Sequence, residues 1–343
     1  MTTEDYSGIW ADLDRQAERE PAPSMVLRLV QGSPDGELHL GVSTPGHLRH
    51  LLVRMPDSWN EDISELPRWR GTRILTRRGA ERPVPHRFLV IEQGELSTRE
   101  VFEVLVGDVC RAVATRSPGT TLEGIVTDRL ARWKSFFDEG RSVGLGPEAQ
   151  QGLFGELWFL RDVLVGRVGL ASAITSWTGA KRANHDFQFP GHAFEVKSST
   201  AKQHVKVYIA SERQLEASGP ESLHLVVLGL NVLDAGGETL PRLVASLRSL
   251  FVEGEPGQRL FEDKLLEAGY IAAHEGHYTT GYAFRSERTY AVVPGFPRLL
   301  ESDLPAGVGD LSYSVVLSAC EPYRCKLAEA LDAAVTPGAG PGP

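Results

Sequence analysis

Two carboxylates and a lysine have the spacing of a catalytic site in residues 185–197. Apolar residues alternate with polar ones on both sides of Pro190-Gly191, which predicts two short strands joined by a tight turn. With a two-residue loop, Asp186 lies directly opposite Glu195, and Lys197 projects from the same face as Glu195. The pattern therefore predicts two acids and one base at one edge of a sheet.

Like charges directly opposite each other, with Cβ atoms roughly 4.5–5.5 Å apart, destabilise a hairpin. A divalent cation shared by Asp186 and Glu195 would remove that penalty, and the Val196 carbonyl offers a third oxygen ligand. Hard oxygen donors favour Mg²⁺, or Mn²⁺ in its place. We therefore expect phosphodiester hydrolysis, in which the metal activates the attacking water and polarises the phosphate. Lys197 would orient that water or stabilise charge in the transition state.

Asp186 and Glu195-Val196-Lys197 resemble the PD-(D/E)XK nuclease signature, and residues 150–230 are similar to one bacterial family of PD-(D/E)XK proteins. His185 stands where the signature has proline, a loss that the superfamily is known to tolerate. The resemblance implies a restriction-endonuclease-like fold with a glutamate on the helix before the catalytic strands. It also implies a place in restriction or phage defence.

Glu156 is the candidate for that helix glutamate. Residues 147–166 predict a helix with one apolar stripe. The stripe consists of Leu153, Leu157, Leu160 and Leu164. Glu156 falls on the apolar side, where a carboxylate costs free energy unless it is paired or bound to a cation. It is either a glutamate at the rim of the stripe or a third acidic member of the site, and we favour the second. Gly152 and Gly155 predict a close approach of the helix backbone to its neighbour.

Four polar residues near the hairpin are candidate substrate ligands. Lys181 and Arg182 precede it, and they either contact a phosphate or are only solvated. Ser199 follows the second strand and offers a hydroxyl donor to phosphate oxygens, although serines at strand ends are common. Gln214 belongs to a short predicted helix, from which it would reach the site.

An arginine-rich segment lies in the strand-like N-terminal part of the chain. Residues 68–87 carry seven arginines and one acid, Glu81. A run of this kind is more often a solvated strand face than a site, but Arg77 and Arg78 are candidate contacts to a phosphate backbone. Trp69 slightly favours the second interpretation, since bases stack on aromatic rings.

The periodicity divides the chain into segments. Residues 1–96 predict a β-rich domain, 97–146 a helical connector and 147–336 a nuclease-like domain, with a disordered tail over 337–343. The apolar run 223–232 lacks alternation, which predicts a strand buried on both faces of a parallel or mixed sheet. The expected fold class is α/β (α+β), with a restriction-endonuclease-like mixed sheet flanked by helices and preceded by the smaller β-rich domain.

The composition is that of an ordinary globular protein, with 343 residues, 41% of them hydrophobic, and a net charge of −9. This charge argues against indiscriminate coating of nucleic acid but allows a local basic surface. Three scattered cysteines indicate neither a disulfide framework nor a cysteine zinc site. We expect a cytoplasmic protein, because neither a signal peptide nor a membrane-spanning run is visible.

Together these features predict a Mg²⁺-dependent endonuclease that acts on DNA in a bacterial restriction or phage-defence system. The alternative is a nuclease-like subunit without catalytic activity, which binds nucleic acid or partner proteins of a defence complex. DNA is the expected partner, joined by other defence proteins such as an ATPase. The sequence is also compatible with a homodimer and predicts no membrane partner.

Overall fold

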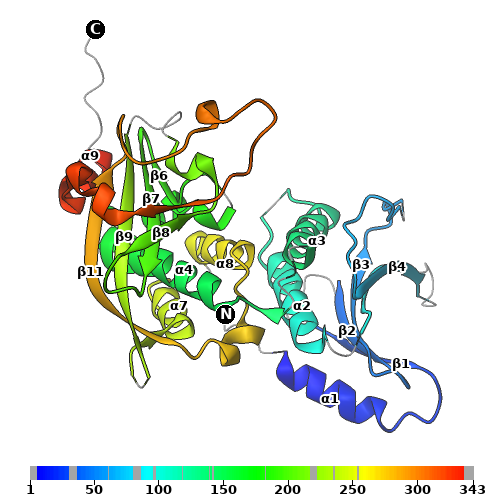
Figure 1. Ribbon diagram of the computed structural model, residues 1–343. Helices are drawn as coiled ribbons and strands as arrows, with labels where there is room; N and C mark the ends of the chain where they lie inside the picture. The colour runs from blue at the N-terminus through cyan, green and yellow to red at the C-terminus, as the bar shows by residue number, and fades with distance from the viewer. Residues whose placement is uncertain are drawn as a thin grey trace. The chain divides into compact units, whose positions relative to one another are not determined.

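The computed structural model describes most of the chain (Figure 1). The described residues are 6–30, 37–60, 62–79, 86–95, 98–117, 119–138, 140, 143–181, 183–216, 222–234, 236–252 and 255–335. The chain folds as two compact units. The first unit consists of Met1–Gly144 and Gly269–His274, and the second consists of Leu145–Ala268 and Glu275–Pro343.

The first unit is built on an antiparallel sheet of five strands in the order β1-β2-β3-β5-β4. The strands are β1 (Met25–Leu29), β2 (Leu38–Ser43), β3 (Arg49–Met55), β4 (Thr72–Arg78) and β5 (Arg87–Gln93). The helices are α1 (Ser7–Ala17), α2 (Arg99–Ala114) and α3 (Leu122–Asp138). The predicted β-rich N-terminal fold is confirmed, and the helices that we predicted as a connector lie in the same unit.

Arg49 joins the sheet of the first unit to its helices. Its guanidinium is buried and donates to both carboxylate oxygens of Asp14 on α1, at 2.6 and 2.9 Å, and to Glu103 on α2 at 2.9 Å. It also lies over the Trp10 ring, 4.6 Å from the centroid. A buried charge needs such partners, so Arg49 marks the face of the sheet that α1 and α2 cover.

Trp69 is part of the packing of the first unit. Its side chain is buried and stacks on Phe137 of α3, with ring centroids 5.4 Å apart and an interplanar angle of 11°. The ring is therefore not free to stack on a base. Our use of Trp69 in support of nucleic-acid binding was wrong, because a ring with an aromatic partner in the core looks the same in sequence as an exposed one.

The second unit contains a mixed sheet with the order β10-β11-β9-β7-β6, in which β13 also pairs with β11. The strands of the unit are β6 (Phe187–Phe189), β7 (His192–Ser199), β8 (Lys206–Ile209), β9 (Ser222–Leu233), β10 (Glu238–Thr239), β11 (Gly281–Ala291), β12 (Tyr313–Val316) and β13 (Arg324–Cys325). The helices are α4 (Pro147–Trp158), the π-helical η4 (Phe159–Leu164), α5 (Val165–Val168), α6 (Leu170–Ser176), α7 (Leu240–Arg248), α8 (Pro256–Glu267) and α9 (Leu327–Val335). The predicted fold class, a mixed sheet with flanking helices, is confirmed.

The β6–β7 hairpin has the predicted register. Phe187 pairs with Phe194 and Phe189 pairs with His192, so the loop is the two residues Pro190-Gly191. Gly191 has a φ of +75°, a left-handed conformation that glycine adopts without strain. Strand β7 runs parallel to β9, most of which is buried, as expected for a central strand in a mixed sheet.

The two faces of this sheet have different coverings. Ala193 on β7 packs in an apolar cluster with Val207 on β8 and Val315 on β12, which form a separate two-stranded sheet. Residues two apart on a strand share a face. Glu195 and Lys197 therefore project to the same side as Ala193, and the opposite face of β7 is the one that α4 covers.

Helix α4 contacts β7 through Gly155. A methyl group on Gly155 would lie 2.9 Å from Ser198 Cβ, so the helix lies too close for any larger residue. Ser198 Oγ donates to the Gln151 carbonyl at 2.9 Å, and Gln151 Nε2 donates to the Ser198 carbonyl at 3.0 Å. The predicted close approach is confirmed for Gly155 and wrong for Gly152, which faces open space.

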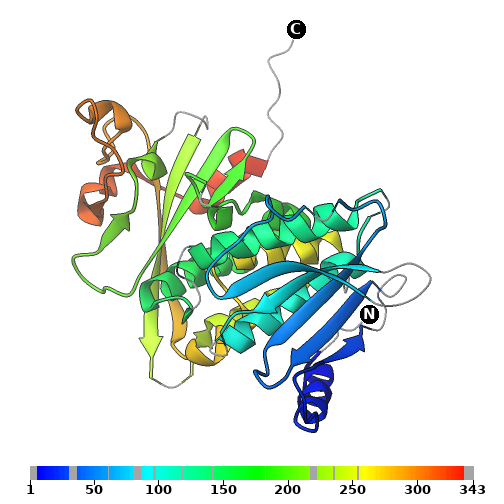
Figure 2. The ribbon, with the colours of Figure 1, turned by 90° about the vertical axis from the view of Figure 1, so that its right-hand side faces the viewer.

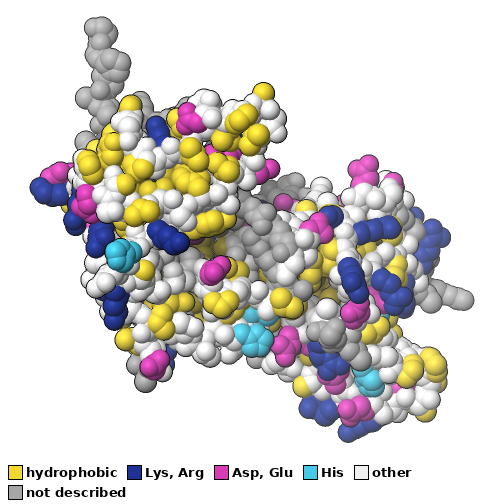
Figure 3. Space-filling model, in the orientation of Figure 1, with side chains coloured by type: hydrophobic (Ala, Val, Ile, Leu, Met, Phe, Trp, Pro, Cys, Tyr) yellow, Lys and Arg dark blue, Asp and Glu magenta, His cyan; other side chains and the backbone are white. Residues whose placement is uncertain are grey.

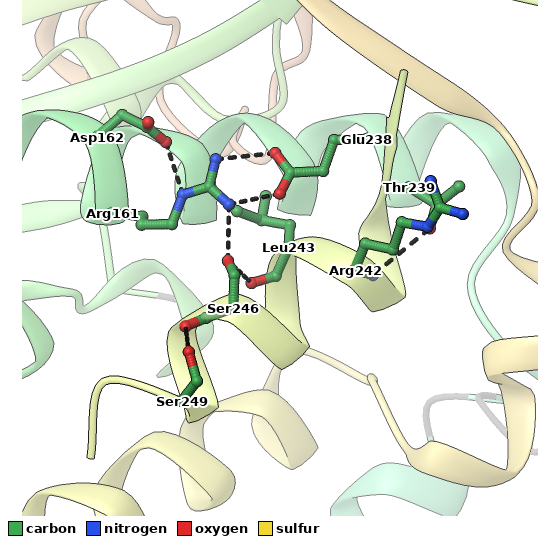
Figure 4. Close-up of polar contacts among 8 residues, drawn as sticks. All are labelled: Arg161, Asp162, Glu238, Thr239, Arg242, Leu243, Ser246 and Ser249. Carbon is green, nitrogen blue, oxygen red and sulfur yellow. Dashed lines mark hydrogen bonds and ion pairs between the residues drawn. The ribbon is translucent and has the colours of Figure 1, made fainter. Parts of the chain in front are cut away.

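Arg161 on η4 holds the continuation of this helix in place. It donates to both oxygens of Glu238 on β10, at 2.5 and 2.8 Å, and to Ser246 Oγ on α7 at 2.6 Å (Figure 4). Its Nε donates to Asp162 at 2.8 Å. A bidentate arginine–carboxylate pair constrains geometry as well as adding energy, so the continuation of the helix that carries Glu156 is fixed against β10 and α7.

The two glycines of α4 provide a matched pair of substitutions. We expect Gly155→Ala to lower the free energy of unfolding by about 1–3 kcal/mol, because the added methyl group overpacks the contact with Ser198. We expect Gly152→Ala to raise it by about 0.5–1 kcal/mol, since alanine is the better helix residue and meets no neighbour. Urea unfolding of both variants tests this, and equal effects would contradict the described packing.

Candidate active site

The candidate site lies at the edge of β7 beyond the point where β6 ends. Asp186 precedes β6, and its Oδ2 accepts a hydrogen bond from the Val196 N–H at 2.8 Å. In an extended strand the N–H and C=O of one residue point to the same side. The Val196 carbonyl therefore faces the same edge as Asp186, as its predicted role as an oxygen ligand requires.

Glu195 and Lys197 form a buried ion pair beside this edge. Lys197 Nζ lies 2.7 Å from Glu195 Oε1, and the Glu195 side chain is fully buried. In the described chain neither carboxylate oxygen of Glu195 has a well-aligned hydrogen bond, and Oε2 has no ion-pair partner either. The contact with Lys197 is therefore the main interaction that offsets the free-energy cost of shielding the Glu195 carboxylate from solvent.

Gln214 holds the lysine from the other side. Its Oε1 accepts from Lys197 Nζ at 3.1 Å and from the Ala210 N–H at 2.8 Å. Gln214 comes from the short 3₁₀ helix η6 (Glu212–Leu215), which follows β8. The structure thus brings Gln214 to the site as predicted. Its side-chain oxygen binds Lys197, whereas the sequence suggested a contact with the substrate.

Glu156 reaches the same edge from α4. Its Oε2 accepts a hydrogen bond from the Trp177 indole N–H at 2.8 Å. A methyl group on Gly179 would lie 3.0 Å from this oxygen and 2.5 Å from Asp186 Oδ1, so both carboxylates lie against the same glycine. Only a residue without a side chain fits there, and the sequence did not indicate this role for Trp177 or Gly179.

The segment around Trp177 is held by a buried lysine that sequence reasoning also missed. Lys264 on α8 donates to the carbonyls of Ile174 at 2.6 Å, of Thr175 at 3.2 Å, and of Trp177. The N–H of Thr178 then donates to the Asp186 carbonyl at 2.7 Å. Lys264 also ends a second acid-x-lysine sequence, Glu262-Asp263-Lys264, which lies within α8. The lysine itself supports the backbone of the site.

Burial dominates the electrostatics of the four charged side chains. It raises the pKa of Glu195 to about 8, with a further contribution from Asp186 and an opposing one from Lys197. Burial likewise raises the pKa of Asp186, partly offset by Lys197. Burial and then the Asp186 charge raise the pKa of Glu156 well above its ordinary value, against the indole hydrogen bond. The pKa of Lys197 is raised because the carboxylates outweigh the opposing effect of burial.

The donor set fits a divalent cation by its chemistry. Two carboxyl groups, Asp186 and Glu195, and the Val196 carbonyl are hard oxygen donors, and Glu195 Oε2 is a buried oxygen that lacks a donor. In the described chain no group of three or more His, Cys, Asp or Glu side chains is arranged to hold a metal ion. A ligand set here would therefore consist of two side chains and a backbone oxygen.

The remaining predicted ligands lie in several places. Ser199 is buried at the end of β7, and its Oγ accepts from the Ala201 N–H at 3.3 Å. Arg182 and the side chain of Lys181 lie outside the described residues. Arg77 and Arg78 are exposed on β4 in the first unit, where neighbouring residues of a strand point to opposite faces. They cannot act as one pair on a single surface.

The model of one protein family, described as "Putative PD-(D/E)XK family member", matches residues 6–318. Neither the curated proteins nor the solved structures contain a match to the chain. Among the residues with a described placement, no helix is both long enough and apolar enough to cross a bilayer.

The raised pKa of Glu195 predicts how stability depends on pH when no metal is present. Between pH 4.5 and about 8 the folded carboxyl keeps its proton while the unfolded one has lost it. The contribution of the protonated Glu195 side chain to the free energy of unfolding is fully present below pH 4.5. It declines as the pH rises and is lost above about pH 8. The loss amounts to about 1.4 kcal/mol per pH unit. Urea unfolding in EDTA should show a shallower decline for Glu195→Gln than for the parent, and parallel curves would contradict the buried carboxyl.

Proposed function

Because the chain belongs to this PD-(D/E)XK family, we propose that it is a Mg²⁺-dependent endonuclease that hydrolyses phosphodiester bonds in DNA. The observation that carries the proposal is the edge of β7. There the Asp186 carboxylate is fixed by the Val196 N–H, and Glu195 and Lys197 project from one face beside it. Two acids, a carbonyl oxygen and a lysine in this arrangement are suited to hydrolysis of a phosphodiester.

Asp186, Glu195 and the Val196 carbonyl would hold Mg²⁺ or Mn²⁺, which supplies the charge that polarises a phosphate and makes water nucleophilic. The remaining electrostatic contribution comes from Lys197. Its ammonium is held by Glu195 and Gln214, so it is oriented before the reaction begins. A donor that is already oriented stabilises charge in the transition state without reorganisation.

The raised pKa of Lys197 suits this role, because the group stays cationic at neutral pH in spite of its burial. Glu156 would complete the acidic side of the site or help to hold a second ion. The indole N–H of Trp177 fixes one oxygen of Glu156, and a fixed ligand loses less entropy when an ion binds.

The second candidate is a nuclease-like subunit that binds nucleic acid or a partner without cleaving it. It is favoured by the ion pair between Glu195 and Lys197 and by the lack, in the described chain, of a three-side-chain metal group. Cleavage by the parent protein decides between the two. A defence role, an ATPase partner and a homodimer stay predictions from the resemblance and the sequence.

Loss of Asp186 tests the metal. We expect Mg²⁺ to stabilise the parent by about 2.7 kcal/mol when its concentration is a hundred times Kd, since it binds only the folded state. Asp186→Asn keeps an acceptor for the Val196 N–H but removes the charge, and it should lose most of that stabilisation. Glu301→Gln, an exposed acid of the same unit, is the control. Equal melting shifts in Asp186→Asn and the parent would exclude this metal site.

Lys197→Ala separates catalysis from binding. We expect cleavage in a single-turnover assay to fall by about 10²–10³, as when one oriented electrostatic group is removed. Stabilisation by Mg²⁺ should persist or increase, because Glu195 loses its buried cation. Lys197→Arg should not restore activity, since a planar fork does not replace an ammonium in a tight site.

The matched control for Lys197 is Lys206→Ala, which removes an exposed lysine on β8. A parent-like rate in Lys197→Ala would contradict the assignment of this site. DNA binding by a parent protein that cleaves neither modified nor unmodified DNA with Mg²⁺ would favour the binding subunit.

A further inference from the structure

The sheet of the first unit has a second face, opposite to the one that α1 and α2 cover. Arg49 points to the helices, as its ion pairs show. Residues alternate along a strand, so His50, Leu52 and Arg54 of β3 point the other way. Figure 2 shows the sheet in front of α2 and α3, seen from this second face. His50 and Leu52 are buried on this face. The candidates for contact with a partner are therefore its exposed and half-buried side chains.

Three side chains form a row across this face, on β4, β5 and β3. Arg77 pairs with Phe88, and Phe88 pairs with Arg54. Side chains that are directly opposed have Cβ atoms roughly 4.5–5.5 Å apart. Phe88 thus lies between two arginines on neighbouring strands, and we call these residues the arginine–phenylalanine row. The His39 ring meets Phe88 edge-on at 5.7 Å and orients it.

The row carries positive charge that the described part of the chain does not neutralise. Arg77 is exposed and Arg54 half-buried, and neither has an ion-pair partner among the described residues. In contrast, Arg73 on the same face of β4 is paired with Glu92. Figure 3 shows dark blue lysine and arginine side chains gathered around β3 and β4. An anionic partner therefore fits this face.

The aromatic ring between the two cations narrows the choice of anion. Arginine binds phosphate through its planar fork, and an aromatic side chain offers a stacking surface to a base. Alternating phosphates and bases are the pattern of a single nucleic-acid strand. An acidic peptide would use the two arginines but has no general use for the ring.

We propose that the arginine–phenylalanine row binds a single nucleic-acid strand, with phosphates at Arg54 and Arg77 and a base against Phe88. This site lies in the first unit and does not depend on cleavage by the second. The proposal keeps Arg77 and drops Arg78 from the two candidate phosphate contacts that the sequence suggested. Only Arg77 shares a face with Phe88 and Arg54.

The test compares two neighbouring arginines. Arg77→Ala and Arg78→Ala each remove one exposed arginine from β4, but from opposite faces. Binding of a fluorescein-labelled single-stranded oligodeoxynucleotide is measured by anisotropy at several salt concentrations, in EDTA so that no metal supports cleavage. We expect Arg77→Ala to weaken binding and to reduce the log–log salt slope by about 0.7, the value for one phosphate on a single strand. Arg78→Ala should bind as the parent does.

Phe88→Leu should weaken binding about tenfold while leaving the salt slope unchanged, because stacking releases no counterion. Lys206→Ala, which removes an exposed lysine from β8 of the second unit, should bind as the parent does. Equal losses in Arg77→Ala and Arg78→Ala, or no binding by the parent, would overturn the proposal. So would displacement by polyglutamate or by duplex DNA at the concentration at which unlabelled single strand displaces the probe.

Discussion

The crowding of three carboxyl groups at one buried sheet edge, with a single lysine, is the constraint on which the second unit depends. If all four groups were ionised, the edge would carry excess negative charge away from water, and that costs free energy. The protein compensates through the Val196 N–H to Asp186, the Trp177 indole to Glu156 and Lys197 to Glu195. These contacts are incomplete, as the raised pKa values of all three carboxyl groups show. The three carboxyl groups therefore hold their protons more tightly than exposed carboxyl groups do.

The surrounding elements limit how far this edge can relax. Gly155 lets α4 lie directly on β7, and Gly179 leaves room for two carboxylates against one backbone position. Lys264 fixes the carbonyl of Trp177, and Gln214 fixes the ammonium of Lys197. The carboxyl groups could move apart only if a helix or a strand moved. The folded state therefore keeps the repulsion between them.

Local pattern was enough to predict the hairpin, because alternation, the turn and the register are properties of one continuous segment. The same reasoning placed Glu156 on the buried side of its helix. It did not find Trp177 or Lys264, whose roles depend on contacts over 21 and 87 residues of chain. It also misread Trp69, since the burial of a ring is decided by Phe137, which is remote in sequence. Residues that support a site from a distance have no local signal.

The position of Lys197 suits both the edge as the structure describes it and the metal-bound edge that we propose. Without a metal, the Lys197 ammonium lies 2.7 Å from Glu195 Oε1 and lowers the free-energy cost of ionising that buried carboxyl group, although burial still raises its pKa to about 8. In the proposed function Asp186 and Glu195 would hold a divalent cation, whose charge would compensate both carboxylates, and Lys197 would no longer be the main electrostatic partner of Glu195. Gln214 would still orient it, so the lysine would keep its place while its charge became available to a phosphate. Lysine suits this exchange because its point charge can turn between partners, whereas the planar fork of arginine would hold the carboxylate in a fixed geometry.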